Sequence, residues 1–146
     1  MKHLILTLAI LSLPITATSQ ITHLPNTGCQ NAGQTPIGGS TSIGQQLFIS
    51  STQLPCNSPG TSGFILLNTT CLVAPPLALG CFNNPCVILL PDVILSKPIS
   101  YNLTVNIPNN VALIGVPFCA QGGCLSTFGG RCLFPLNLVA RVRITR

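Results

Sequence analysis

The stretch ISYNLTVNI at residues 99–107 carries the pattern that decides the fold class. Its side chains alternate between apolar and polar types, and successive side chains of a β-strand point to opposite faces of a sheet. One set comprises Tyr101, Leu103, Val105 and Ile107, and the other comprises Asn102, Thr104 and Asn106. A period of two over this length predicts a half-buried strand whose apolar face lies on a core.

The last residues of the chain repeat this alternation. We expect one set of side chains to face the core, namely Leu136, Leu138, Ala140, Val142 and Ile144. We expect the other set to face outward, namely Asn137, Val139, Arg141, Arg143 and Thr145. A final strand that is buried on one face is therefore predicted.

Between and before these two segments, short apolar runs alternate with turn residues. Further strands are predicted over 47–49, 64–67, 87–90, 93–95 and 111–119, and Gly122-Gly123 and Gly129-Gly130 are expected to bracket a loop. No segment after residue 20 keeps a helical period, and proline recurs too often for long helices. The pattern predicts an all-β fold, a single disulfide-stapled β-sandwich of about seven short antiparallel strands.

The N-terminal residues have the order of features of a cleavable signal peptide. A lysine precedes an apolar run over 4–13, and Ala17 and Ser19 are small residues at the positions that a signal peptidase reads. Cleavage after Ser19 would divide the chain into a signal peptide at 1–19 and a β-sandwich domain at 20–146. The alternative, a buried N-terminal helix or strand, does not account for this order. We therefore expect a secreted protein, extracellular or at the cell surface, with no transmembrane segment in the mature chain.

The chain has eight cysteines, and all of them follow the predicted cleavage site. They are Cys29, Cys56, Cys71, Cys81, Cys86, Cys119, Cys124 and Cys132. An even number of cysteines in an exported chain indicates disulfide bonds. Eight cysteines allow about a hundred pairings, so the connectivity stays open at this point.

Metal binding is the alternative use of these sulfur atoms. Four residues separate Cys81 from Cys86 and Cys119 from Cys124, and four thiolates are able to hold zinc. Structural zinc sites more often have two intervening residues, and exported cysteines oxidise, so we favour disulfides. Calcium sites need several carboxylates, which this chain lacks. No metal and no cofactor are therefore predicted.

Charged residues are sparse, and Asp92 is the only acidic one. After the predicted cleavage site, five basic residues against this one acidic residue give a net charge of +4. Catalysis by paired carboxylates is thus excluded within one chain, and a serine triad would have to use His23 and Asp92. His23 lies close to the predicted mature N-terminus, where chains are usually frayed. Because nucleophile-elbow, phosphate-loop and dinucleotide motifs are also missing, we expect no enzyme activity and no catalytic residue.

Arg141, Arg143 and Arg146 form a basic strip on the predicted last strand. Such a strip is a candidate contact for an anionic polysaccharide, a membrane surface or nucleic acid. The alternative is that charges on an exposed strand keep sheets from pairing edge to edge, and we favour this alternative. No nucleic-acid partner is predicted.

Two tripeptides match the acceptor motif for N-glycosylation, Asn68-Thr69-Thr70 and Asn102-Leu103-Thr104. The motif often occurs by chance, and it matters only in a host that modifies such sites. These tripeptides therefore add nothing to the choice between functions.

Residues 102–121 resemble a segment of secreted proteins and C-terminal modules of planctomycete-type bacteria. The matching positions are Ile107, Pro108, Asn109, Ala112, Leu113, Gly115, Phe118 and Gln121, and Gly28-Cys29 and Pro85-Cys86 resemble two further family motifs. The resemblance covers nearly all of the chain after residue 20. It implies a compact β-sandwich with no known activity, and it implies that Cys29 pairs with Cys86. The chain departs from the family in its six further cysteines and in lacking the acidic residue that usually follows the glutamine.

The residues of this segment have a structural interpretation. Pro108-Asn109-Asn110 is expected to form a tight turn, because proline presets φ and asparagine tolerates unusual backbone angles. Gly115 within a strand suggests a bulge or close packing. Gln121 is expected to satisfy buried backbone groups.

These observations favour an exported structural or interaction module at the cell surface or in extracellular matrix, with a matrix or cell-surface protein or glycan as partner. Two alternatives stay open. A carbohydrate- or surface-binding module would use exposed aromatic side chains, and the chain has Tyr101 and six phenylalanines. A surface-active film former of the hydrophobin type would share eight cysteines and low charge. Hydrophobins, however, carry adjacent cysteine pairs, and this chain has none.

Overall fold

The computed structural model describes residues 20–29, 32–51, 61–78, 85–98, 101–126, 132–133 and 136–146. The predicted signal peptide at 1–19, Cys56, Cys81 and Gly129-Gly130, the expected far end of the predicted loop, lie outside the described residues. Within the described residues, the regular structure consists of β-strands and one turn of 3-10 helix, and all named strands pair antiparallel. The prediction of an all-β fold is confirmed.

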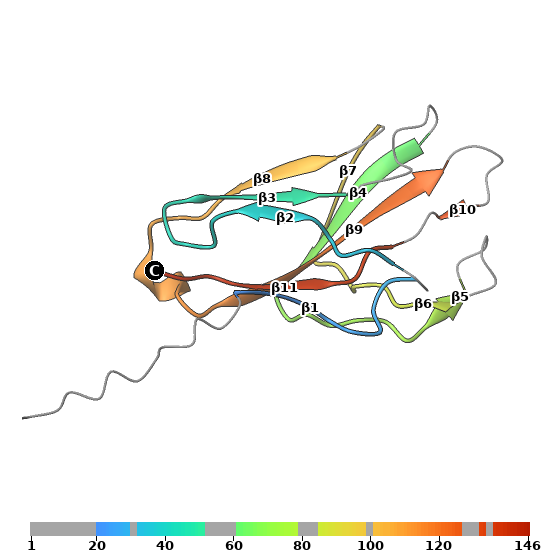
Figure 1. Ribbon diagram of the computed structural model, residues 1–146, viewed down its shortest axis with the longest axis horizontal. Coiled ribbons are helices and arrows are strands. Elements are labelled where there is room, and N and C mark those ends of the chain that lie inside the picture. The colour runs from blue at the N-terminus through green and yellow to red at the C-terminus, as the bar shows by residue number, and fades with distance from the viewer. Residues whose placement is uncertain are drawn as a thin grey trace, which may run out of the picture.

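The strands form three sheets (Figure 1). The six-stranded sheet has the order β1-β11-β9-β4-β7, and β10 pairs with β9 off this path. Its strands are β1 (Ile21–His23), β4 (Thr61–Asn68), β7 (Val93–Pro98), β9 (Pro117–Ser126), β10 (Cys132–Leu133) and β11 (Ala140–Arg143). The three-stranded sheet, in the order β2-β3-β8, contains β2 (Ile37–Gly39), β3 (Gln46–Ser50) and β8 (Asn102–Asn106). The third sheet pairs β5 (Leu77–Ala78) with β6 (Pro85–Cys86).

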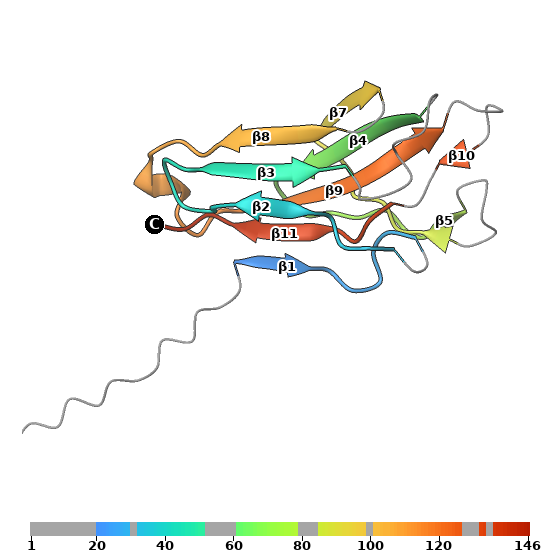
Figure 2. The ribbon, with the colours of Figure 1, turned by 45° about the horizontal axis from the view of Figure 1, so that its top comes forward.

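The six-stranded and three-stranded sheets face each other across the main core (Figure 2). The buried side chains of this core are Leu47, Ile49, Ile65, Ile107, Ala120, Val142 and Ile144. They come from β3 on one side and from β4, β9 and β11 on the other, with the residues that follow β8 and β11. Removing this apolar surface from water is the main favourable term for joining the two layers.

The opposite face of the six-stranded sheet carries a second, smaller core. Its buried residues are Leu66, Leu89, Cys119 and Val139, and Leu24, Phe64, Cys71 and Ile88 pack against them. Residues between β4 and β7 thus cover part of this face as a further layer. The prediction of a strand over 87–90 is wrong. This segment pairs only through isolated bridges, which join Val87 to Gly28 and Leu89 to Val73.

Gln121 connects this covering layer to β9. Its side chain is fully buried. Its Oε1 accepts a hydrogen bond from the Leu89 amide at 2.7 Å, and its Nε2 donates to the carbonyls of Val87 at 3.1 Å and Asn137 at 2.8 Å. The expectation that Gln121 satisfies buried backbone groups is confirmed.

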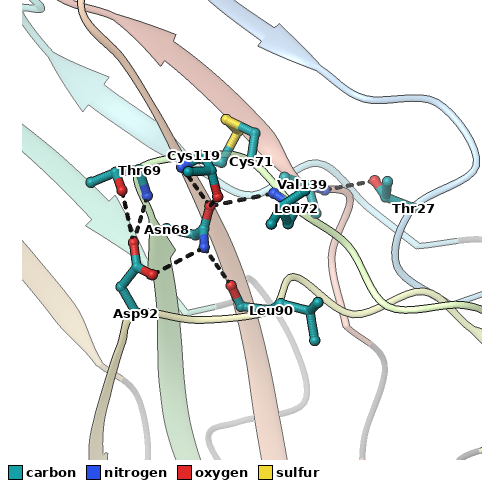
Figure 3. The surroundings of a disulfide bond; sticks show 10 residues. Thr27, Asn68, Thr69, Cys71, Leu72, Leu90, Asp92, Cys119 and Val139 are labelled. Atoms are coloured by element: carbon teal, nitrogen blue, oxygen red, sulfur yellow. Dashed lines mark hydrogen bonds between the residues drawn. A yellow bond between two sulfur atoms is a disulfide. The ribbon is translucent and has the colours of Figure 1, made fainter.

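Disulfide bonds fix the covering layer in place. Cys29 pairs with Cys86 and Cys71 pairs with Cys119, with Cα–Cα distances of 4.1 and 5.1 Å. Cys124 is also disulfide-bonded. The prediction of disulfides is confirmed for these five cysteines, and the Cys29–Cys86 pair is the one that the resemblance implies. Figure 3 shows how the second bond joins Cys71 to Cys119 of β9, beside Asn68 at the end of β4.

Replacing both Cys29 and Cys86 by alanine is expected to lower the free energy of unfolding by about 2–5 kcal/mol. The bond joins residues 57 positions apart, so its loss greatly increases the conformational freedom of the unfolded chain. Changing both residues together avoids leaving a reactive thiol. Chemical denaturation followed by circular dichroism without reductant measures the effect, and an unchanged midpoint would contradict it.

The alternation of side chains is confirmed in β8 and in β11. Leu103 and Val105 are half-buried between exposed polar neighbours, and Ala140 and Val142 are buried whereas Arg141 and Arg143 are exposed. The expectation that Asn137 and Val139 face solvent is wrong. Val139 is fully buried in the second core, because the covering layer lies over the outer face of the sheet at this point.

The prediction of a loop bracketed by Gly122-Gly123 and Gly129-Gly130 is wrong at its start, because Gly122 and Gly123 lie inside β9, which continues to Ser126. A Cβ atom on Gly122 would lie 2.0 Å from the carbonyl oxygen of Ser51, and one on Gly123 would lie 2.5 Å from the ring of Phe64. Glycine is needed here because other parts of the chain approach the strand closely, and no turn is involved.

The segment 111–119, predicted as one strand, is divided. Val111–Leu113 forms a 3-10 helix, η1, and the Asn110 side chain accepts a hydrogen bond from the Ala112 amide at 3.0 Å. Gly115 has a φ of 84°, in the left-handed region that glycine adopts at little cost, so it forms a turn rather than a bulge. The strand β9 therefore begins only at Pro117.

Candidate binding surfaces

Arg141 and Arg143 both project from β11 and are exposed. β11 lies inside the six-stranded sheet, paired with β1 on one side and with β9 on the other. The favoured interpretation, that these charges protect a sheet edge from pairing, is therefore wrong, because β11 has no free edge along these residues. The arginines stand on a face of the sheet instead.

The cross-strand partners of the two arginines are uncharged. Arg141 lies opposite Thr22 on β1 and Cys119 on β9, and Arg143 lies opposite Pro117 on β9. The covering layer buries Val139, two residues before Arg141, but leaves both arginines exposed. We call Arg141 and Arg143 the arginine pair. Arg146, the third residue of the predicted strip, is exposed beyond the end of β11.

The two residues that a catalytic triad would need lie far apart. His23 belongs to β1 and Asp92 directly precedes β7, and β1 and β7 are the opposite edges of the six-stranded sheet. The Nε2 atom of His23 lies 3.2 Å from the carbonyl oxygen of Thr35. Asp92 accepts hydrogen bonds from the Thr69 amide at 2.8 Å and from the Thr69 hydroxyl at 2.9 Å (Figure 3). The carboxylate is therefore used to hold the turn after β4.

The two glycosylation motifs have different surroundings. The Asn68 side chain is buried, and its Nδ2 atom donates to the Leu90 carbonyl at 2.7 Å (Figure 3). Its Oδ1 atom accepts from the Thr70 amide at 2.7 Å. In the folded protein, this motif therefore serves as a turn anchor, whereas Asn102 is exposed on β8.

The zinc alternative is wrong. Of its four cysteines, Cys86, Cys119 and Cys124 are disulfide-bonded, so their sulfur atoms are not thiolate ligands. The fourth, Cys81, lies outside the described residues. In the described part of the chain, no three metal-ligating side chains cluster, and no helix has the length and apolar character to cross a bilayer.

The outer face of the three-stranded sheet is a second candidate surface, which was not predicted from the sequence. Phe48 of β3 is 47% exposed there, between Gln46 and Ser50. The sequence already indicates this exposure. Phe48 is two residues from Gln46 and from Ser50, so it shares their face of the strand, whereas the buried Leu47 and Ile49 lie on the other face. A cleft of about 660 Å³ adjoins Phe48.

The chain matches no protein-family model, no curated protein and no solved structure.

Proposed function

We propose that the protein is an exported, non-catalytic interaction module that holds an anionic polysaccharide of the cell surface or extracellular matrix through the arginine pair. The observation that carries this proposal is the position of Arg141 and Arg143 on an interior strand. A charge there does not protect a sheet edge, and it contributes nothing to the buried core. Binding an anion is the role that best accounts for two such side chains.

The geometry of the arginine pair suits a linear polyanion. Residues two apart on a strand point to the same face and lie about 7 Å apart along it. Each guanidinium group presents a planar fork of donors that matches a carboxylate or sulfate group. The neighbouring strands β1 and β9 contain no acidic residue that would compete for these donors.

Export and the lack of catalysis belong to the same proposal. Disulfide bonds form and persist outside the cytoplasm, and two of them connect the layers of this fold. The separation of His23 from Asp92 supports a role without acid–base chemistry. A rigid, sparsely charged scaffold that presents two cations fits attachment better than turnover.

The test is binding to dextran sulfate, with uncharged dextran as the control polymer. The R141Q/R143Q double variant is expected to lose about tenfold or more in affinity at low ionic strength, because two charge-assisted contacts disappear. Binding by the unaltered protein should weaken as salt is added. Biolayer interferometry on immobilised polymer measures both effects.

Lys97→Gln is the matched control for Arg141→Gln, since each removes one exposed positive charge. Lys97 lies on β7, at the edge of the sheet away from β11, and its ammonium group stands 5.9 Å from the centre of the Tyr101 ring. We expect the lysine variant to bind dextran sulfate within about twofold of the unaltered protein. Equal losses in the two single variants would mean that net charge alone drives binding, and the proposal would then fail.

A further inference from the structure

The outer face of the three-stranded sheet is uncharged and polar, with one aromatic side chain at its centre. β3 contributes Gln46, Phe48 and Ser50, and β8 contributes Asn102, Thr104 and Asn106. We call these six residues the amide face. Five of them are exposed, and Ser50 is partly so, because no other part of the described chain covers this side of the sheet.

Cross-strand hydrogen bonds fix the polar groups on either side of the aromatic ring. Gln46 donates to Asn106 Oδ1 at 3.0 Å, and Ser50 donates to Asn102 Oδ1 at 2.7 Å. Phe48 lies between these two pairs, opposite Thr104. Amide groups held in place before binding lose little conformational freedom when a ligand arrives.

The cleft beside Phe48 adds further uncharged groups. The amide face supplies Phe48, Ser50 and Asn102 to its lining, and the segment around β2 supplies Gln34 and Gly38. His23 of β1 is the one ionisable side chain in its lining, and no carboxylate, lysine or arginine lines it. At about 660 Å³, the cleft has the size of a small-ligand site, and its aromatic and amide groups converge as such sites require.

We infer that the amide face and its cleft bind a neutral oligosaccharide, with Phe48 as the stacking platform. A sugar ring presents an apolar face of C–H groups that packs on an aromatic ring, and its equatorial hydroxyls both donate and accept hydrogen bonds. Phe48 supplies the first contact, and Asn102 supplies the second through the amide nitrogen that its bond with Ser50 leaves available. The lack of charge matches a neutral ligand and does not match an ionic one.

A peptide strand on the free edge of β2 is the competing occupant, and the structure favours the sugar. β2 is only three residues long, so its edge offers few main-chain hydrogen bonds to an added strand. The polar groups of the amide face instead come from side chains of β3 and β8, whereas a peptide added to β2 would pair through its main chain in the plane of the sheet.

The experiment is a titration with a panel of neutral hexasaccharides, namely cellohexaose, xylohexaose, laminarihexaose, maltohexaose and mannohexaose, followed by NMR and calorimetry. We expect saturable binding of at least one of them, with shifts at the Phe48 ring and the Asn102 side-chain amide. Phe48→Ala should weaken it about tenfold or more, and Phe48→Trp should restore it. Binding should not change with ionic strength, in contrast to polyanion binding.

Val111→Ala is the matched control for Phe48→Ala, because Val111 is an apolar side chain that is 70% exposed on η1, outside the amide face. It should leave the affinity for the hexasaccharide unchanged. R141Q/R143Q should also leave this affinity unchanged, so that the proposals for the amide face and for the arginine pair are tested independently. The inference is overturned if no hexasaccharide binds to protein with intact disulfides. It is also overturned if binding survives Phe48→Ala, or if the shifts fall only on the β2 main chain.

Discussion

The Gly122→Ala variant will lose about 3 kcal/mol or more of its free energy of unfolding. The added methyl group would lie 2.0 Å from the Ser51 carbonyl oxygen and 2.7 Å from that of Ser50. Both neighbours are main-chain atoms at the end of β3, so the two sheets would have to move apart to admit it. The Gly122 amide, which donates to Thr35 Oγ1 at 3.1 Å, would lose its alignment as well.

Gly38→Ala is the control for this substitution. A Cβ atom on Gly38 meets nothing within 4 Å, and its φ lies outside the left-handed region. We expect a change in stability of less than about 0.5 kcal/mol, measured by urea denaturation alongside Gly122→Ala. If both alanine variants were equally stable, the close contact between β9 and residues 50–51 would be refuted.

Gln121→Met will lower the free energy of unfolding by about 3–5 kcal/mol, because it leaves the Leu89 amide and the Asn137 carbonyl without a partner, while the Val87 carbonyl keeps its bond from the Gly28 amide. Methionine has nearly the shape of glutamine, so packing is largely kept while the bonds to Leu89, Val87 and Asn137 are lost. The effect should be strongest on the covering layer. Hydrogen exchange at the Leu89 amide, which loses its acceptor, should therefore accelerate more than exchange in β3.

Gln46→Met makes the same chemical change on the exposed amide face. Gln46 contributes one hydrogen bond, to Asn106, and solvent is available to replace it. We expect Gln46→Met to lower the free energy of unfolding by no more than about 0.5 kcal/mol. Thermal and chemical unfolding of the two variants, measured side by side, checks this difference. A Gln121 variant as stable as the Gln46 variant would show that the covering layer does not depend on this side chain.

The positions of several strands could be predicted because alternation is a local property. In β8 and in β11, each side chain takes the face that its parity predicts, and Arg141 and Arg143 are exposed as expected. The alternation of side chains does not indicate whether another segment lies over a given face of the sheet. Val139 is two residues from Arg141 and lies on the same face, yet it is completely buried in the second core.

The candidate sites divide in the same way. The basic strip was visible in the sequence, but its meaning depended on whether β11 is an edge strand, and that is decided by pairing with β1 at the other end of the chain. Gly122 illustrates a similar limit. A pair of glycines is compatible with a turn or with close packing, and only the approach of Ser51 distinguishes the two.

By itself, the sequence determined the strand character of the chain, its lack of paired acid–base groups and its capacity for disulfide bonds. Each of these follows from residue type and local spacing, without knowledge of distant contacts. Only the tertiary structure decided that the arginine pair lies on an interior strand and that Phe48 is exposed at the centre of the uncharged amide face. Both depend on contacts between segments that are distant in the sequence, because these contacts decide which strands are paired on both sides and which side chains stay exposed.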